Sequence, residues 1–253
     1  MLGVLALVGS VDAASAQGLT VAAASDLQAV LPTLAQQFQR ETGHAVNATF
    51  GSSGNFFTQI QNGAPFDVFF SADLDYPKRL EAARLAMPNS LRVYALGRIV
   101  LWTRNDSGID VGRGLAVLDE ARVRRIAMAN PEHAPYGRAA VAALQHEHLY
   151  DRVRGKLVLG ENISQAAQFV QSGNAEVGII ALSLTLAPGL RAQGTSADIP
   201  SSFYPPIEQA VVVLSSSRHE DLARQFVAFL DRPDVVRLLQ NYGFTRPATP
   251  GRP

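Results

Sequence analysis

The sequence predicts an α/β fold built on mainly parallel sheets. Short apolar segments suited to strands alternate with helix-length segments, the pattern produced when helical crossovers connect parallel strands. The chain has 253 residues, near the upper limit for one hydrophobic core, so one large domain or two medium-sized lobes are expected. Apolar residues make up 47% and charged residues 17%, the balance of an ordinary soluble globular protein.

The predicted strands and helices follow one another along most of the chain. The strands, in order, are Leu19–Ala24, Ala45–Phe50, Phe66–Ser71, Ile99–Thr103, Arg125–Ala129, Lys156–Leu159, Val177–Ala181 and Gln209–Leu214. The helices are Leu27–Glu41, Asn55–Gln61, Tyr76–Arg84, Arg138–Leu149, Ser164–Gln171 and Glu220–Asp231. Pro32 favours a kink early in the first helix. The tail after Arg246 is predicted to be disordered.

Charge and cysteine content exclude several classes of function. Lys plus Arg and Asp plus Glu number 22 each, so the chain lacks the broad basic field that nucleic acid or an anionic membrane attracts. The absence of Cys excludes disulfides, zinc-thiolate sites, iron–sulfur clusters, thiol catalysis and a lipid-modified N-terminal Cys. If the protein binds an anion, local geometry must supply the binding.

The first sixteen residues have two features of a signal peptide. Leu2 to Val8 is an apolar run too short to span a bilayer, and Ala14-Ser15-Ala16 is a small-x-small cleavage signal before Gln17. No Lys or Arg lies between Met1 and the apolar run. Two interpretations stay open: the true start lies upstream, or the segment is a flexible tail. We expect export and, because no other segment approaches about 20 apolar residues, a soluble mature protein.

Four of the strand-to-helix junctions share one chemistry. They are Ser25-Asp26-Leu27-Gln28, which matches a capping box, Gly51-Ser52-Ser53-Gly54-Asn55, Asn130 to Gly137, and Glu161-Asn162-Ile163-Ser164-Gln165. Asn162 is a candidate N-cap. Ligands of open α/β sheets lie beyond the carboxyl ends of strands, where helix starts present free N–H groups and the positive end of the helix dipole. Four such starts can surround a small dianion; the alternative is that their side chains only cap helices.

The ordered motifs resemble those of the periplasmic molybdate-binding proteins of ABC transporters, from about Leu19 to Thr245. The resemblance is carried by AAASDL (22–27), FGSSGN (50–55), GAPFDVFFSAD (63–73), NPEHAPYG (130–137), GENISQA (160–166), EVGII (176–180) and YGFT (242–245). It implies a two-lobed type II binding-protein fold with the oxyanion between the lobes. Lobe I is then residues 17–95 plus 206–253, and lobe II is residues 96–205. It further implies a monomeric periplasmic protein that binds molybdate or tungstate and delivers it to permease subunits, without a cofactor or a protein-bound metal ion.

The resemblance also implies the residues that hold the anion. Ser25 matches the serine of AAAS, and Ser53 matches the serine two after the Gly of FGSS. Tyr136 matches a backbone position, and Ile163 matches a position that acts through its N–H. Some members supply a tyrosine hydroxyl at the place of Ala181, whereas others have a tyrosine at the place of Tyr136. Whether Tyr136 donates through its hydroxyl, its N–H or both is open.

A site made only of donors suits this ligand. Molybdate is fully deprotonated at neutral pH, so its oxygens only accept hydrogen bonds, whereas hydrogenphosphate needs an acceptor for its proton. Sulfate also only accepts hydrogen bonds, so it is the alternative ligand. Only the size of the cavity would distinguish it from the larger molybdate and tungstate. Asp26 conflicts with an all-donor site, and its carboxylate is expected to point away from the cleft.

Two other functions were weighed on particular residues. His146-Glu147-His148 resembles a metal cluster, but residues two apart on a helix do not face each other, and a solvated face is preferred. A periplasmic serine hydrolase would need Ser53, a histidine such as His133 and an acid to converge. No G-x-S-x-G sequence is present, so the protein is not expected to be an enzyme.

Overall fold

The computed structural model describes residues 18–247 and contains two five-stranded sheets. The first sheet has the order β2-β1-β3-β10-β4. Its strands are β1 (Leu19–Ala24), β2 (Val46–Gly51), β3 (Val68–Ser71), β4 (Arg92–Gly97) and β10 (Ile207–Val213). The predicted signal peptide and nearly all of the predicted tail lie outside the described residues.

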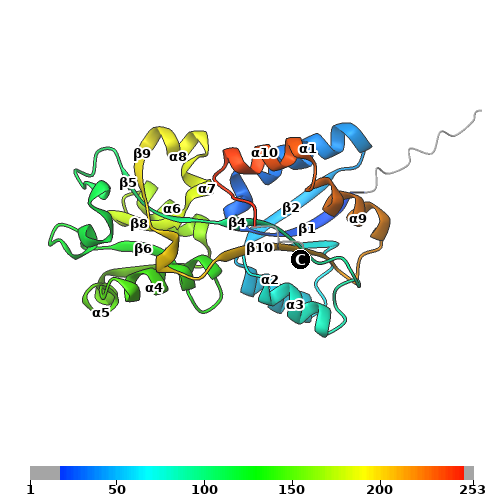
Figure 1. Cartoon of the computed structure of the whole chain (residues 1–253), viewed down its shortest axis with the longest axis horizontal. Helices are drawn as coiled ribbons and strands as arrows, with labels where there is room; N and C mark the ends of the chain where they lie inside the picture. Colours follow the sequence, from blue (N-terminus) through cyan, green and yellow to red (C-terminus); the bar gives the residue numbers. More distant parts are fainter. Residues whose placement is uncertain (1–17, 248–253) are drawn as a thin grey trace, which may run out of the picture.

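The second sheet has the order β7-β6-β8-β5-β9. Its strands are β5 (Ile99–Arg104), β6 (Ile126–Ala129), β7 (Leu157–Gly160), β8 (Val177–Ala181) and β9 (Gly194–Asp198). The chain therefore passes from the first sheet to the second between Gly97 and Ile99, and it returns between Asp198 and Ile207. We call each sheet with its helices the first or second half of the molecule; the halves lie side by side in Figure 1.

Helices cover both sheets. Those of the first half are α1 (Leu31–Thr42), α2 (Ser53–Gln61), α3 (Asp75–Ala82), α9 (Glu220–Phe229) and α10 (Pro233–Asn241), with the 3-10 turn η1 (Ser25–Ala29). Those of the second half are α4 (Pro135–His146), α5 (Tyr150–Val153), α6 (Ile163–Gln171), α7 (Leu182–Thr185) and α8 (Pro188–Gln193), with the 3-10 segments η2 (Val111–Asp119), η3 (Arg154–Lys156) and η4 (Ser201–Phe203). No described helix has both the length and the apolar character needed to cross a membrane.

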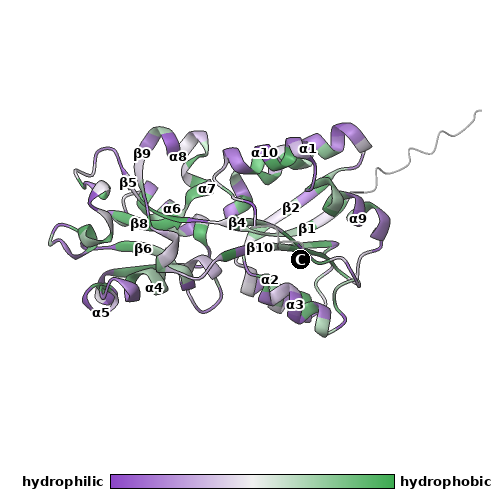
Figure 2. Ribbon diagram, in the orientation of Figure 1, coloured by the Kyte–Doolittle hydropathy of each residue, from purple (hydrophilic) through white to green (hydrophobic). Residues whose placement is uncertain are grey.

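Apolar side chains are concentrated between the sheets and their helices. Each sheet has its own core, with Phe38, Phe70 and Phe226 central to the first and Trp102 fully buried in the second. Figure 2 shows hydrophobic strands inside each half and hydrophilic outer helix faces. Most of each apolar core therefore belongs to one half, although Ala24 and Ala72 of the first half pack against the core of the second.

The structure confirms the α/β class and every predicted strand, while the sheets are mixed. In each sheet two pairings are parallel and two are antiparallel, because β10 and β5, the strands next to the crossovers, run against their neighbours. The sequence pattern missed β4 and β9. Both are edge strands with one neighbour, and β9 (GTSAD) is mainly exposed, so it has no apolar signal.

The predicted first helix is divided into two elements. Its start is the 3-10 turn η1, and α1 begins only at Leu31, with Pro32 in its first turn. Proline is tolerated in the first turn of a helix, because no intrahelical N–H bond is lost there. Pro32 therefore lies at the start of α1 and does not kink the helix as predicted. The predicted capping box is wrong, because no side chain caps η1.

Candidate functional site

One small cavity between the two halves brings together all four candidate binding residues. Ser25, Ser53, Tyr136 and Ile163 line it, although up to 138 positions separate them along the chain. The other lining residues are Ala24, Asp26, Gly51, Ser52, Ala72, Ala134 and Pro135. Among the described residues, no Lys, Arg or His lines this cavity. Any anion held there must therefore be bound by hydroxyl and N–H groups.

The start of α2 leaves one backbone N–H and one hydroxyl proton available at Ser53. The N–H groups of the next three residues have partners: Gly54 donates to the carbonyl of His133, and Asn55 and Phe56 donate to the Oγ and carbonyl of Ser52. The fully buried Oγ of Ser53 accepts a 3.0 Å bond from the N–H of Ala72. Because that N–H can only donate, the Ser53 hydroxyl proton must point elsewhere.

The start of α6 repeats this arrangement across the cavity. Asn162 is the N-cap, as predicted, and its Oδ1 accepts from the N–H of Gln165 at 3.0 Å. The N–H of Ser164 donates to the Oγ of Ser25 in the other half, at 3.3 Å. Ile163, the first residue of α6, is left with an N–H that has no partner within the helix. The Ser25 hydroxyl, like that of Ser53, accepts from an N–H and keeps its own proton to donate.

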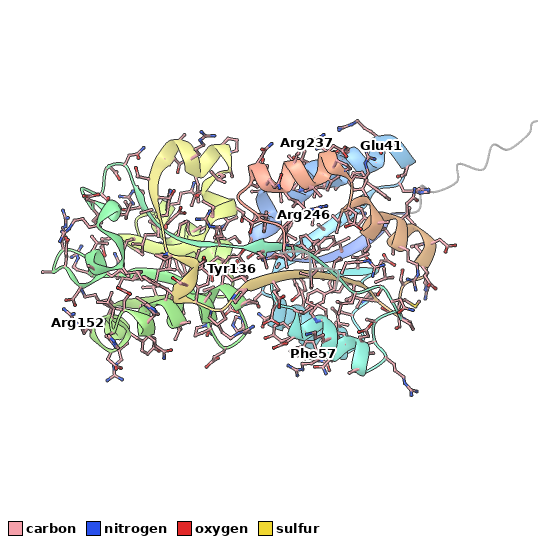
Figure 3. The ribbon with its side chains drawn as sticks, in the orientation of Figure 1. Glu41, Phe57, Tyr136, Arg152, Arg237 and Arg246 are labelled. Carbon is pink, nitrogen blue, oxygen red and sulfur yellow. The ribbon has the colours of Figure 1, made fainter. Side chains whose placement is uncertain are left out.

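Tyr136 uses its hydroxyl group for another purpose. The hydroxyl donates to Asp26 Oδ2 at 2.9 Å and accepts from Gln209 Nε2 at 3.2 Å. Burial and the neighbouring Asp26 carboxylate raise the pKa of Tyr136 well above its ordinary value, so the hydroxyl keeps its single proton. Figure 3 labels Tyr136 between the two halves. Its N–H belongs to the first turn of α4, where no intrahelical acceptor exists, and is the group left for an anion.

Asp26 is one of the residues that line the cavity, and its carboxylate is hydrogen-bonded to Tyr136 of the second half. The residue is fully buried. Its Oδ2 is bonded to Tyr136, whereas Oδ1 has no partner among the described residues. Burial raises the pKa of Asp26 to about 7, although the hydrogen bond from Tyr136 opposes this increase. A carboxyl group with this pKa is partly protonated at neutral pH.

Direct contacts join the two halves at the edge of the cavity. His133 accepts the Gly54 N–H through its carbonyl at 2.9 Å, and its Nδ1 lies 2.9 Å from Ser52 Oγ. The Nε2 of His133 is 3.6 Å from a carboxylate oxygen of Glu161. A carboxylate beside Nε2 favours the tautomer with its proton there, so the Ser52 hydroxyl donates to Nδ1. His133 thus contacts Ser52, not the Ser53 that the hydrolase hypothesis required.

A cross-half ion pair lies beside these contacts. Arg138 of α4 pairs with Asp73, and its guanidinium lies 3.4 Å from the hydroxyl oxygen of Tyr76. Both partners belong to the first half. Because the pair is partly exposed, it contributes little to stability. Its position, with one partner in each half, links the two halves.

Sequence reasoning missed two polar groups behind the site. Gln209 is fully buried and donates to Tyr136, and Ser183 donates to the backbone carbonyl of Asp26 at 2.7 Å. A Gln within the apolar strand IEQAVVV was the available signal for the first, because a buried amide needs hydrogen-bond partners. No sequence pattern indicates the second.

Comparisons with known proteins agree with this architecture. The sequence model of the family described as bacterial extracellular solute-binding protein matches residues 19–245. The chain is 39% identical to the molybdate-binding protein ModA of Azotobacter vinelandii over 92% of this chain and 91% of that protein. It is 36% identical to the protein of the same name from Rhodobacter capsulatus, over 95% and 93%.

The fold comparison gives the same result. The solved structure of the Azotobacter vinelandii periplasmic molybdate-binding protein superimposes with a TM-score of 0.86 at 35% identity, covering 91% of this chain and all of that one. The predicted two-lobed binding-protein fold is thereby confirmed. These relatives are binding proteins of transporters and not enzymes. The chain belongs to the bacterial extracellular solute-binding protein family.

Proposed function

We propose that this protein binds molybdate, and tungstate as its close analogue, in the cavity between its two halves. The observation that carries the proposal is the convergence of free donors without a cationic side chain. They are the hydroxyls of Ser25 and Ser53 and the N–H groups of Ser53, Tyr136 and Ile163. A fully deprotonated tetrahedral oxyanion matches them, because it only accepts hydrogen bonds.

The donors come from both halves, so the anion would hold them together. We propose lobe I as residues 17–95 plus 206–253 and lobe II as residues 96–205. In this scheme the anion binds an open form, and closure about the crossovers buries it. The contacts of His133 with Ser52 and Gly54 would form at the end of closure and favour the closed form.

We further propose that the protein acts in the periplasm as a monomer and delivers its anion to the permease subunits of an ABC importer. The names of the relatives support the ligand, and the solved structure of a periplasmic molybdate-binding protein supports the compartment. A cleaved signal peptide over residues 1–16 belongs to the same proposal. No cofactor is needed, because the reaction is capture and release.

Calorimetric titration of the purified protein with molybdate, tungstate, sulfate and phosphate tests the ligand. We expect binding of molybdate and tungstate with dissociation constants far below about 100 μM, because charge-assisted hydrogen bonds contribute roughly 1.5–3 kcal/mol each. Sulfate and phosphate should bind much more weakly. Binding of sulfate alone would replace the ligand assignment.

The matched variants Ser25→Ala and Ser53→Ala test the site. Each removes one hydroxyl donor, and each should weaken molybdate binding by about 1–3 kcal/mol. Unchanged affinity in both variants would place the anion elsewhere. Melting temperatures measured without ligand show whether a variant has lost affinity or has lost its fold.

A further inference from the structure

Asp26 lies where the two halves meet, and its environment raises a problem of charge. Its side chain accepts a hydrogen bond from Tyr136 of the second half, and its carbonyl accepts one from Ser183 of the same half. The residue is fully buried and lines the proposed anion cavity. Its remaining oxygen, Oδ1, has no hydrogen-bond partner among the described residues.

The groups that face Asp26 do not neutralise a negative charge. The backbone N–H groups of Asp26 and Leu27 face it and lower its pKa without adding a charge. The side chains are the hydroxyls of Tyr136 from α4 and Tyr94 from β4, and the amide of Gln209 from β10. All three are uncharged at neutral pH, since burial raises the pKa of both tyrosines well above 10. Among the described residues, no Lys, Arg or His forms an ion pair with Asp26.

An ionised Asp26 would oppose the binding of a dianion. Both charges would lie in one water-poor cavity, where electrostatic repulsion is much stronger than in water. A neutral carboxylic acid removes the repulsion. Because Oδ2 already accepts from Tyr136, the proton belongs on Oδ1, which then becomes an O–H donor. The protonated side chain would then place no negative charge beside the bound anion.

We propose that this site binds its oxyanion together with one proton, held on Oδ1 of Asp26. The proton comes from solvent as the anion enters and returns to solvent when the anion leaves, and no other bond is made or broken. The inference rests on the proposed function, because it concerns the same cavity and the same dianionic ligand.

Linkage gives the expected size of the effect. With a pKa of about 7 in the ligand-free protein, Asp26 is mostly neutral at pH 6, and binding there needs little proton uptake. Above pH 7 the anion must bind to the shrinking protonated fraction, so affinity falls by up to about tenfold per pH unit. Between pH 6 and pH 9 the dissociation constant for molybdate should rise about 100-fold. Molybdate keeps the same charge over this range.

The experiment measures the molybdate dissociation constant of the purified protein from about pH 6 to pH 9. Asp26→Asn is isosteric, carries no charge and can still accept from Tyr136, so its affinity should vary less than about threefold and exceed that of the unchanged protein at pH 9. His133→Gln is the control for the other titratable group at the cavity edge and should retain the full pH dependence. A flat wild-type profile, or an equally steep one in Asp26→Asn, would overturn the proposal.

A second measurement needs no variant. Calorimetry at pH 8 in buffers of different ionisation enthalpy gives the number of protons taken up with molybdate. We expect a value close to one, and a value near zero would overturn the proposal even if Asp26→Asn failed to fold. If molybdate does not bind at any pH, the proposed function fails; if it binds without proton uptake, only the role of Asp26 fails.

Discussion

Replacing Asp26 with Asn should make the ligand-free protein more stable at alkaline pH, in contrast to most substitutions of buried residues. The carboxyl group is fully buried, and burial raises its pKa from 3.8 to about 7. In the unfolded chain the group ionises near pH 4. Between these two values the folded protein binds a proton that the unfolded chain has released, so stability decreases as pH rises.

The shift sets the magnitude. Each pKa unit corresponds to about 1.4 kcal/mol, so the free energy of unfolding loses about 4 kcal/mol in total as pH rises from below 4 to above 7. Of this, roughly 2–3 kcal/mol is lost between pH 5 and pH 8. Asn carries no charge at any of these pH values. The stability of Asp26→Asn relative to the unchanged protein should therefore increase by that amount over the same interval.

Thermal unfolding of both proteins without ligand, at pH 5 and at pH 8, measures the difference. For a chain of this size it corresponds to a relative increase in melting temperature of roughly 5–10 °C for the variant. Asp234→Asn is the control. The hydrogen bond from Arg232 holds the pKa of Asp234 at about 2, so this carboxyl group is ionised above pH 5 in both the folded and the unfolded chain, and its replacement should not change the pH dependence of stability. A difference between Asp26→Asn and the unchanged protein that does not vary with pH would refute the reasoning.

Three further substitutions separate the roles of neighbouring groups. Ser52→Ala removes the N-cap of α2 and should lower stability by about 1 kcal/mol, while molybdate affinity changes less than about threefold. A loss of affinity as large as that of Ser53→Ala in calorimetry would contradict this separation of roles. Tyr136→Phe keeps the backbone N–H, so affinity at pH 6 should stay within about tenfold of the original, and abolished binding would identify the hydroxyl as the donor. Gly54→Ala places a Cβ atom 2.6 Å from the carbonyl oxygen of His133. This variant should bind molybdate at least about tenfold more weakly and show less compaction by small-angle scattering when molybdate is added, whereas unchanged affinity would show that the contact is not needed for closure.

The strand pattern could be predicted because burial leaves a local signature. The strand β8 is apolar and buried along its whole length, and β1 is so at every position except Thr20. Both were predicted with their observed bounds, since strands buried on both faces need such residues. The edge strand β9 has no such signature. Its pairing with β5 is made by backbone groups, which all residues except Pro share, so side-chain pattern alone does not reveal it.

The proposed site could be predicted from the sequence as a set of donors but not as an arrangement. The cap Asn162 could be identified because helix starts have residue preferences within three or four positions, whereas Ser53 and Ile163 were assigned through the family resemblance of their motifs. Which neighbouring serine caps α2 could not be predicted, because Ser52 and Ser53 occupy equivalent places in the same motif. Ser52 is the cap because the Oγ of Ser53 already accepts a hydrogen bond from the N–H of Ala72, and because His133 of the other half contacts the Oγ of Ser52.

The sequence by itself determined the α/β class, the positions of the helix starts and the kinds of donor that each start offers. Only the tertiary structure decided that Tyr136 gives its hydroxyl to Asp26 and Gln209, and that Asp26 remains beside the cavity. The physical reason is range. Periodicity and capping are set by residues a few positions apart, whereas Asp26 and Tyr136 are 110 positions apart and meet only because the two halves pack against each other.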